Sequence, residues 1–335
     1  MSEEPAATGR SGDAAATGDA PGAGRATPWQ VWLVRVLAVA GLGVVAWACA
    51  TAWGAVVHGH PAYAVLLGLT AVGSAVVLWR SRRPTPPRTR ARGVLRVLAT
   101  VAAVAWLAAV AWLRPFVAVE PALDAMKSDD AVTVTTSATR VVLTPTGEPD
   151  GTAVFFQPGA KVEARAYAAV LRPLAEAGHT VVIAQQPLGI GFLATGAFDD
   201  ARDAHPEAER WVLGGHSLGG VVASTQADAA DEDEVAPAAG LLLYASYPAG
   251  DVSTSLTAAV ESVSGSRDGL STPESIEASR ADLPPGAGFT VVDGAVHAFF
   301  GDYGPQPGDG TPTISHDGAR EQIAAASVAF VDRVG

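Results

Sequence analysis

Residues 211–220 read Trp211-Val212-Leu213-Gly214-Gly215-His216-Ser217-Leu218-Gly219-Gly220, and the interpretation of the whole chain starts from this stretch. An apolar run leads into the pattern Gly-x-Ser-x-Gly, and small residues with helical spacing follow it over residues 219–224. This order of strand, sharp turn and helix is typical of a nucleophile elbow. Because Gly215 and Gly219 have no Cβ, the strand and the helix can approach closely around Ser217. We therefore expect Ser217 Oγ to stand exposed at the carboxyl edge of a sheet.

The helix expected just after Ser217 has a chemical consequence. Its first backbone N–H groups have no acceptor inside the helix, so the N–H of Leu218 is placed to stabilise a developing oxyanion. The five-residue pattern alone is weak evidence, because chance matches to so short a pattern are expected in a chain with 36 glycines. The alternative is a glycine-rich turn between strand and helix with no chemistry, so the rest of the chain must support the interpretation.

Composition limits the classes of partner and cofactor. The chain has 335 residues and a net charge of −12, with +7 on residues 1–119 and −19 on residues 120–335. The acidic second part argues against nucleic acid as a partner, because phosphate binding needs a basic face. Cys49 is the single cysteine, which excludes a disulfide within the chain and a cysteine-based metal site. We find no His-Glu-x-x-His and no Gly-Lys-Ser/Thr motif, and we expect neither metal nor cofactor.

Three apolar runs, over residues 36–57, 63–79 and 97–113, explain the high mean hydropathy of +0.24. Each has about 17–22 residues, which as a helix crosses or nearly crosses a hydrocarbon core of about 30 Å. Aromatic residues lie near their ends, as they do at membrane interfaces: Trp29, Trp32, Tyr63, Trp79 and Trp112. Three buried helices of a soluble protein are the alternative, which the uncharged length disfavours. We therefore expect residues 29–119 to form a membrane region with three helices.

Charge around these runs predicts their orientation. The loop over residues 80–93 is strongly basic, whereas the loop over residues 58–62 has no Lys or Arg. The positive-inside rule places the basic loop and the N-terminus in the cytoplasm, so the chain beyond Arg114 is expected on the other side of the membrane. Residues 1–28 have no apolar periodicity, and we expect them to form a disordered cytoplasmic tail.

From residue 131 onward the pattern changes to short strands alternating with helices. Residues 131–144 alternate and are rich in Val and Thr, which favours antiparallel strands. Further strands are expected at residues 152–156, 180–184, 211–214, 241–245, 260–264 and 289–292. Helices are expected between them and over residues 314–334. This alternation predicts an α/β domain over residues 120–335, with a mostly parallel sheet covered by helices on both faces.

Three chemically matched residues each follow a predicted strand, where sites of open parallel sheets lie. These residues are Ser217, Asp268 and His297. His297 is the candidate base that takes the serine proton, and Asp268 is the candidate acid that fixes its tautomer. Asp251 is the alternative acid, whereas His316 is more naturally a helix cap or surface residue. We expect His216, inside the elbow, to be structural.

The oxyanion needs a second donor besides Leu218. The loop after the strand at residues 152–156 is expected to supply it, and Pro158 has no N–H. The donor is therefore Ala160 or Gly159, and we favour Ala160.

From about residue 152 onward the sequence resembles the serine α/β-hydrolases of the dienelactone-hydrolase-like type. The resemblance rests on Gln157-Pro158-Gly159-Ala160-Lys161-Val162, Ala166-Tyr167, Gly214-Gly215-His216-Ser217-Leu218-Gly219-Gly220, Asp268-Gly269 and Gly294-Ala295-Val296-His297. It implies an α/β-hydrolase fold and the order Ser217 nucleophile, Asp268 acid, His297 base. Many bacterial members carry N-terminal membrane helices, and the excess of Arg over Lys is typical of a high-GC bacterial genome. Gln157 departs from the His-Gly that many hydrolases have before the oxyanion loop.

Two functions from different classes follow. The favoured one is a membrane-anchored serine hydrolase that cleaves acyl esters or thioesters outside the cytoplasm. The other is a non-catalytic membrane scaffold whose hydrolase-like domain binds a ligand or partner. Only about 14 residues separate the strands at 241–245 and 260–264, too few for a large cap, so we expect an open site for a small or extended acyl ester. Apolar residues expected near Ser217 are Phe192, Leu193, Phe198, Tyr247, Phe299, Phe300 and Tyr303.

Overall fold

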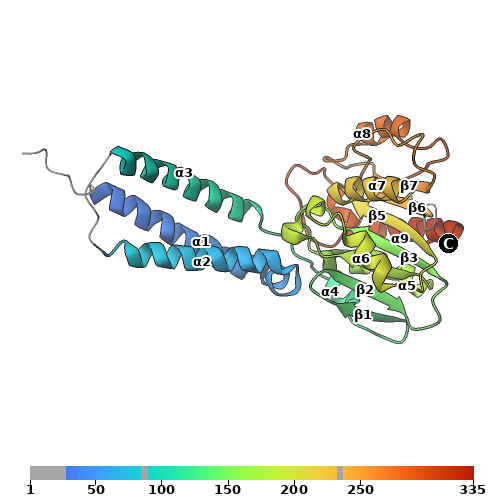
Figure 1. The fold of residues 1–335 in the computed structure, drawn as a ribbon. Coiled ribbons are helices and arrows are strands. Elements are labelled where there is room, and N and C mark those ends of the chain that lie inside the picture. The colour runs from blue at the N-terminus through green and yellow to red at the C-terminus, as the bar shows by residue number, and fades with distance from the viewer. Residues whose placement is uncertain (1–27, 84–89, 232–236) are drawn as a thin grey trace, which may run out of the picture.

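The computed structural model describes residues 28–83, 90–231 and 237–335. Within them the chain forms a bundle of three long helices and an α/β domain joined to one end of the bundle (Figure 1). The tail expected over residues 1–28 lies outside the described residues, apart from Pro28. Part of the basic loop, at residues 84–89, also lies outside them.

The three bundle helices are α1 (Pro28–His58), α2 (Pro61–Arg80) and α3 (Arg90–Trp112). All three are long and apolar enough to cross a membrane, and they contain nearly all of the three apolar runs that the sequence marked out. Most of their apolar side chains point away from the protein, which leaves them for lipid. The sequence prediction of three apolar helices as candidate membrane spans is confirmed.

Helix α1 has a kink near the end that faces the α/β domain. Ala52 has non-helical torsions of φ −139° and ψ 29°. The Arg114 guanidinium donates to the Thr51 carbonyl oxygen at 2.9 Å and to Thr51 Oγ1 at 2.8 Å. It also lies over the Trp47 ring, 5.3 Å from the centroid. A charged group and an aromatic ring therefore lie together near Thr51, as is typical of a membrane interface.

The α/β domain is built on one eight-stranded sheet. Its strands are β1 (Val132–Thr136), β2 (Arg140–Pro145), β3 (Thr152–Gln157), β4 (Thr180–Ala184), β5 (Arg210–His216), β6 (Gly240–Tyr244), β7 (Ala259–Gly265) and β8 (Gly288–Val292). They lie in the order β1-β2-β4-β3-β5-β6-β7-β8. Strand β2 is antiparallel to β1 and β4, and the remaining neighbours are parallel. The predicted antiparallel entry into a mostly parallel sheet is therefore confirmed.

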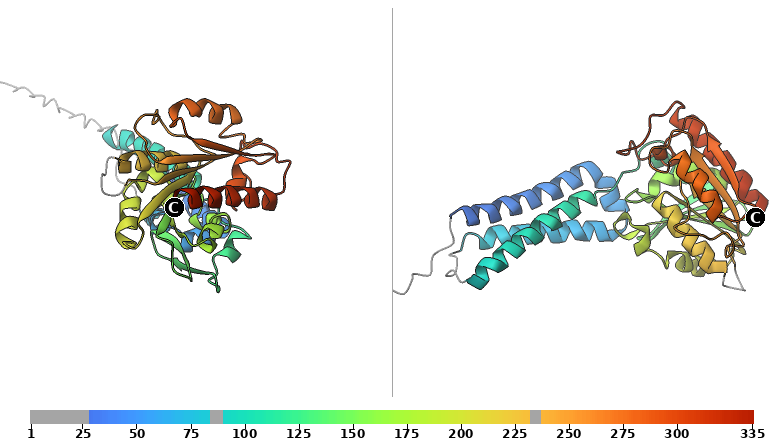
Figure 2. Two further views of the ribbon diagram at one scale, coloured as in Figure 1. Left: turned by 90° about the vertical axis from the view of Figure 1, so that its right-hand side faces the viewer. Right: turned by 90° about the horizontal axis from the view of Figure 1, so that it is seen from above.

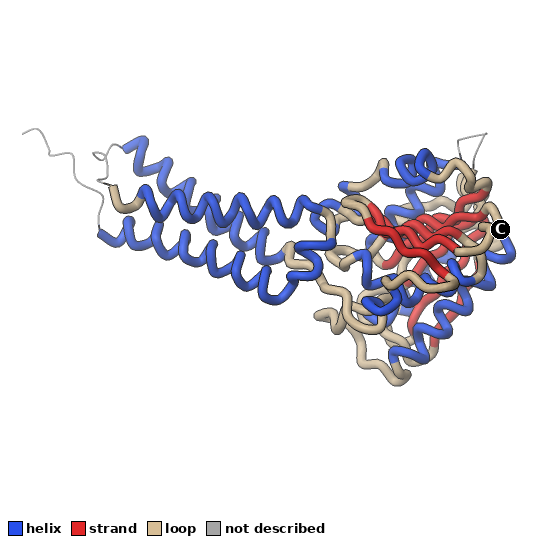
Figure 3. The backbone as a smooth tube through the Cα atoms, turned by 90° about the horizontal axis from the view of Figure 1, so that it is seen from below, coloured by secondary structure: helices blue, strands red, loops and turns tan. Residues whose placement is uncertain are grey.

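Helices cover both faces of this sheet, with the strands between them in Figure 3. One face packs under α5 (Ala168–Glu176) and α9 (His316–Val334), and the other under α6 (Ala197–Ala204) and α7 (Leu218–Asp231). Strands β3, β4 and β6 are buried at every position, as expected for parallel strands covered on two sides. The domain also contains the short helices α4 (Ala122–Ala125), α8 (Pro273–Ala278), η1 (Ala164–Tyr167), η2 (Pro187–Gly189), η3 (Gly191–Leu193), η4 (Ser279–Asp282) and η5 (His297–Phe300).

The segment that follows α3 is hydrogen-bonded to the α/β domain. Phe116 forms a parallel bridge with Val162, in which Phe116 N donates to Lys161 O at 2.8 Å and Glu163 N donates to Phe116 O at 2.9 Å. A few residues on, Ala118 N donates to Glu163 Oε2 at 3.0 Å. The bundle therefore meets the domain at the loop that leaves β3, and Figure 2 shows the bundle joined to one end of the domain.

Candidate active site

Ser217 stands at the turn between β5 and α7, as the sequence predicted. Its backbone has φ +52°, a left-handed conformation that is strained for a residue with a Cβ. The turn is held in place because Ser217 N donates to Tyr244 O at 3.0 Å and Ser246 Oγ donates to Ser217 O at 2.6 Å. This strained, clamped conformation is that of a nucleophile elbow.

The glycines of the elbow are required by close backbone approach. A Cβ on Gly215 would lie 2.4 Å from the carbonyl carbon of Gly219. A Cβ on Gly219 would lie 2.1 Å from the carbonyl oxygen of Gln157, at the end of β3. These distances are far below van der Waals contact, so the start of α7 can pack onto the exit loop of β3 only with glycine at these positions.

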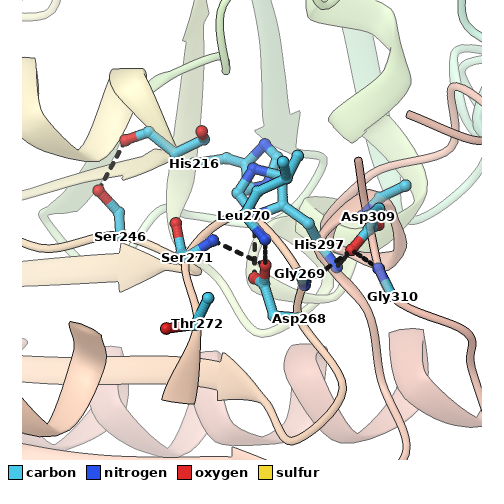
Figure 4. Close-up of polar contacts among 12 residues, drawn as sticks. His216, Ser246, Asp268, Gly269, Leu270, Ser271, Thr272, His297, Asp309 and Gly310 are labelled. Atoms are coloured by element: carbon cyan, nitrogen blue, oxygen red, sulfur yellow. Dashed lines mark hydrogen bonds and ion pairs between the residues drawn. The ribbon is translucent and has the colours of Figure 1, made fainter. Parts of the chain in front are cut away.

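The structure brings Asp268 and His297 together. Asp268 follows β7 and His297 begins η5, and both are buried. His297 Nδ1 lies 2.9 Å from Asp268 Oδ2, while Asp268 Oδ1 accepts from the N–H groups of Leu270 and Ser271 at 2.8 Å each (Figure 4). The carboxylate is therefore oriented by its own loop, and it fixes the tautomer of His297 with the Nδ1 proton toward Asp268.

This tautomer leaves His297 Nε2 as the acceptor. Nε2 is buried and has no hydrogen-bond partner in the described part of the chain. The Ser217 hydroxyl likewise makes no hydrogen bond among the described residues, so the serine–histidine hydrogen bond is not formed in this structure. Such contacts are often long without substrate and shorten when it binds.

Asp309 links the loop of Asp268 to the loop of His297, and nothing in the sequence singled this residue out. Its Oδ1 accepts from His297 N at 3.1 Å and from Gly269 N at 3.2 Å, and its Oδ2 accepts from Ala298 N at 2.8 Å (Figure 4). One carboxylate therefore binds the backbone beside both Asp268 and His297. The residue lies between Gly308 and Gly310 in a loop without regular structure, so no periodic signal marked it.

His216 is structural, in agreement with the sequence expectation. Tyr167 Oη accepts from Gly159 N at 2.9 Å and is hydrogen-bonded to His216 Nδ1, 2.8 Å away. Burial, and then the neighbouring His297, hold the pKa of His216 well below its ordinary value. His216 therefore stays neutral beside His297, whose ring centroid is 4.5 Å away. A neutral neighbour does not oppose a positive charge that develops on His297.

The same contact corrects one candidate oxyanion donor. The N–H of Gly159 is occupied by Tyr167 Oη, so Gly159 is not free to bind an oxyanion. Within the described residues, the N–H groups of Ala160 and Leu218 have no acceptor. Of the two second donors left open by the sequence, the structure leaves Ala160 available.

A chain of buried amides supports the loop that leaves β3. Gln157 Nε2 donates to Gln226 Oε1 at 3.1 Å, and Gln186 Nε2 donates to Gln157 Oε1 at 2.9 Å and to Pro158 O at 3.0 Å. Gln226 in turn donates to Thr195 O at 2.7 Å. Gln157, which replaces the His-Gly of many hydrolases, therefore joins the exits of β3 and β4 to α7.

The other candidates lie elsewhere. Asp251 is exposed and accepts from Ser253 N at 2.9 Å, so the structure pairs His297 with Asp268 and not with the alternative acid. The cap of α9 is Ser315 and not His316, which stacks on Phe299 and lies 3.4 Å from Asp302. Phe198 was expected near Ser217, but it packs in the core against Phe155 and Trp211 because α6 turns it toward the sheet.

Metal binding has no support in the described part of the chain, where no three His, Cys, Asp or Glu side chains gather to hold an ion. Residues 228–234 are rich in Asp and Glu, and residues 232–234 of this stretch lie outside the described part of the chain.

Comparison with known proteins agrees with this geometry. Residues 153–321, half of the chain, match the alpha/beta hydrolase family. The chain therefore belongs to the α/β-hydrolase family, and its strand order, elbow and Asp268–His297 pair define an α/β-hydrolase fold. No curated protein sequence matches the chain.

Solved structures with a similar fold include several hydrolases at low sequence identity. A thermostable esterase from Pseudomonas putida is 13% identical with a TM-score of 0.45, over 64% of this chain and 87% of the esterase. A monoacylglycerol lipase from Paleococcus ferrophilus is 15% identical with a TM-score of 0.44, over 61% of this chain and 100% of the lipase. A dienelactone hydrolase-like promiscuous phosphotriesterase from metagenomic libraries is 17% identical with a TM-score of 0.44, over 61% of this chain and 99% of that chain.

Proposed function

We propose that this α/β-hydrolase is a membrane-anchored serine hydrolase that cleaves acyl esters or thioesters through an acyl-enzyme. The observation that carries the proposal is the strained elbow at Ser217 together with the buried His297–Asp268 pair, in which His297 Nε2 is left as a free acceptor.

The roles of the residues follow from this arrangement. His297 Nε2 takes the proton of Ser217 as Oγ attacks the carbonyl carbon, and Asp268 stabilises the imidazolium that forms. The N–H groups of Leu218 and Ala160 bind the oxyanion. His297 then returns the proton to the leaving alcohol or thiol, and a water molecule deprotonated by His297 releases the acid from Ser217. Each step uses groups of the chain and water alone.

The orientation in the membrane is part of the proposal. The end of α2 and the start of α3, which flank the basic loop, lie at the end of the bundle far from the α/β domain (Figure 1). With the positive-inside rule, this arrangement supports an α/β domain outside the cytoplasm. Protease digestion of intact cells tests it: loss of the domain is the expected result, and full protection contradicts it.

Labelling of membranes with a fluorophosphonate probe tests the chemistry. Wild type is expected to label, Ser217→Ala to lose all labelling, and His297→Ala and Asp268→Asn to label far more slowly, because they lose the base or its tautomer. Asp251→Ala is the matched control and is expected to label like wild type. Absence of labelling of a folded, membrane-inserted wild type would contradict the proposal and favour a binding scaffold.

A further inference from the structure

The edge of the sheet that carries Ser217 faces the membrane helices. The loop leaving β3 touches the end of α3, where Lys161 Nζ donates to Trp112 O at 3.0 Å and lies 4.4 Å from the centroid of the Trp112 ring. The loop leaving β4 touches the bundle through Leu188, which packs against the apolar cluster of Ala48, Tyr63, Leu67 and Val110. The nucleophile therefore sits on the side of the domain that lies against the bilayer.

The height of Leu188 places its loop at the membrane boundary. Leu188 packs against the cluster that includes Tyr63 and shares a small pocket with Ala55 and His60, at the end of the bundle where Arg114 binds Thr51. Leu188 has φ +56°, a left-handed conformation unfavourable for a leucine, and its packing on the bundle helps to offset that strain.

Two large apolar side chains extend this loop without any protein cover. Phe192 and Leu193 form most of η3 and are 53% and 55% exposed. They lie close to the nucleophile elbow, because Gly191 sits against Val222 of α7, with an added Cβ 3.0 Å from Val222 Cγ2. Exposed neighbouring aromatic and aliphatic residues are unfavourable in water and favourable at a lipid surface.

We propose that residues 187–193 form a membrane-contacting loop and that Ser217 takes its substrate from the adjacent leaflet, as a long-chain acyl ester of a lipid. This proposal rests on the proposed function and adds the class of substrate. The loop is continuous with the bundle, because Leu188 packs on the candidate membrane helices. This continuity supports the bilayer as the surface that Phe192 and Leu193 contact. Lipid ester carbonyls lie at the boundary between hydrocarbon and water, the height at which this loop sits. The reaction consumes one ester and one water and yields a fatty acid and an alcohol.

Two esters with one leaving group test the proposal. The full-length protein is reconstituted in phosphatidylcholine vesicles and given 4-methylumbelliferyl oleate, which partitions into the bilayer, or 4-methylumbelliferyl acetate, which stays largely in water. For Phe192→Gln/Leu193→Gln, the ratio of oleate to acetate hydrolysis is expected to fall about tenfold, because the loop loses its apolar contact with lipid. Val291→Gln is the matched control, since Val291 is 58% exposed on the edge strand β8, and it is expected to keep the wild-type ratio.

The outcomes separate this proposal from the proposed function. A wild type that cleaves the acetate but not the oleate overturns the lipid substrate and leaves the serine hydrolase intact. An unchanged ratio in the double variant overturns the role of the loop. A wild type that cleaves neither ester and takes no fluorophosphonate label overturns the serine hydrolase itself.

Discussion

Replacing Asp309 by Ala tests whether this residue positions the catalytic loops. The substitution removes the acceptor of His297 N and Ala298 N, both partly buried, and of Gly269 N, which is exposed. A partly buried N–H that loses its acceptor costs about 1–3 kcal/mol, and water replaces part of the loss. We therefore expect Asp309→Ala to lower the free energy of unfolding by about 2–4 kcal/mol.

The effect on activity is expected to be larger than a simple loss of folded protein. A displacement of a catalytic group by about 1 Å costs about 100-fold in rate, so kcat with a soluble ester should fall by about that factor while KM changes little. The kcat of Asp309→Asn should lie between those of Asp309→Ala and wild type. The asparagine keeps one carbonyl oxygen as an acceptor, but it presents an NH2 group to Ala298 N or to His297 N.

The assay is ester hydrolysis at a temperature where thermal unfolding shows every variant to be folded. Asp251→Ala serves as the control, because Asp251 is exposed and binds only its own loop. Wild-type kcat in folded Asp309→Ala would refute the reasoning, because it would show that Asp268 and His297 hold their geometry without this clamp.

Two further predictions concern the residues behind the site. Tyr167→Phe leaves Gly159 N and His216 Nδ1 buried without partners and should cost about 2–4 kcal/mol in chemical denaturation, whereas Tyr303→Phe, which loses one partly buried hydrogen bond, should cost less. His216 stays neutral in the folded protein because burial lowers its pKa, whereas in the unfolded chain it binds a proton below about pH 6.5. The free energy of unfolding should therefore decrease as the pH is lowered below about 6.5, by up to about 1.4 kcal/mol per pH unit. His216→Gln should remove this part of the pH dependence, and equal slopes for wild type and variant would contradict it.

Much of the site could be predicted because its signals are local or follow from topology. The spacing of Gly215, Ser217 and Gly219 is a local requirement of the turn, and the structure shows the close approaches behind it. Asp268 and His297 could be paired because both follow parallel strands, whose carboxyl ends meet at one edge of the sheet.

What the sequence did not reveal depends on contacts between distant segments. Asp309 lies 12 residues after His297 in a loop with no periodicity, so only the folded chain shows that it binds His297 N. The sequence left Gly159 open as a donor beside the favoured Ala160, and only the fold shows that Gly159 N is bound by Tyr167, on the helical turn η1 eight residues further along. The position of the membrane helices against the β3 and β4 exit loops is likewise a tertiary contact, with no pattern of its own.

The segment between α3 and the α/β domain shows how strongly the two parts depend on each other. The sequence boundary at residue 120 leaves Phe116 and Ala118 with the membrane region, yet Phe116 exchanges two hydrogen bonds with Lys161 and Glu163 and packs on Tyr303 at 5.8 Å between centroids. Ala118 is buried and donates to Glu163 Oε2. Val119 N also donates to Asp302 O at 2.9 Å, so the segment makes four hydrogen bonds with the domain. At about 1 kcal/mol each, and with the burial of part of a phenylalanine, they amount to about 5–6 kcal/mol.

That amount is a large part of the 5–15 kcal/mol that a domain of ordinary stability has. A chain that begins at residue 120 should therefore unfold at a much lower denaturant concentration than one that begins at residue 115. It should also lose activity beyond its loss of stability, because Phe116 N donates to Lys161 O directly after Ala160, the proposed oxyanion donor. Both chains lack the bundle, so a difference between them reports on residues 115–119 alone. Equal denaturant midpoints and equal rates of ester hydrolysis would show that this segment only connects the bundle to the domain. A lower midpoint with unchanged kcat would show that the segment stabilises the domain but does not affect the loop that contains Ala160.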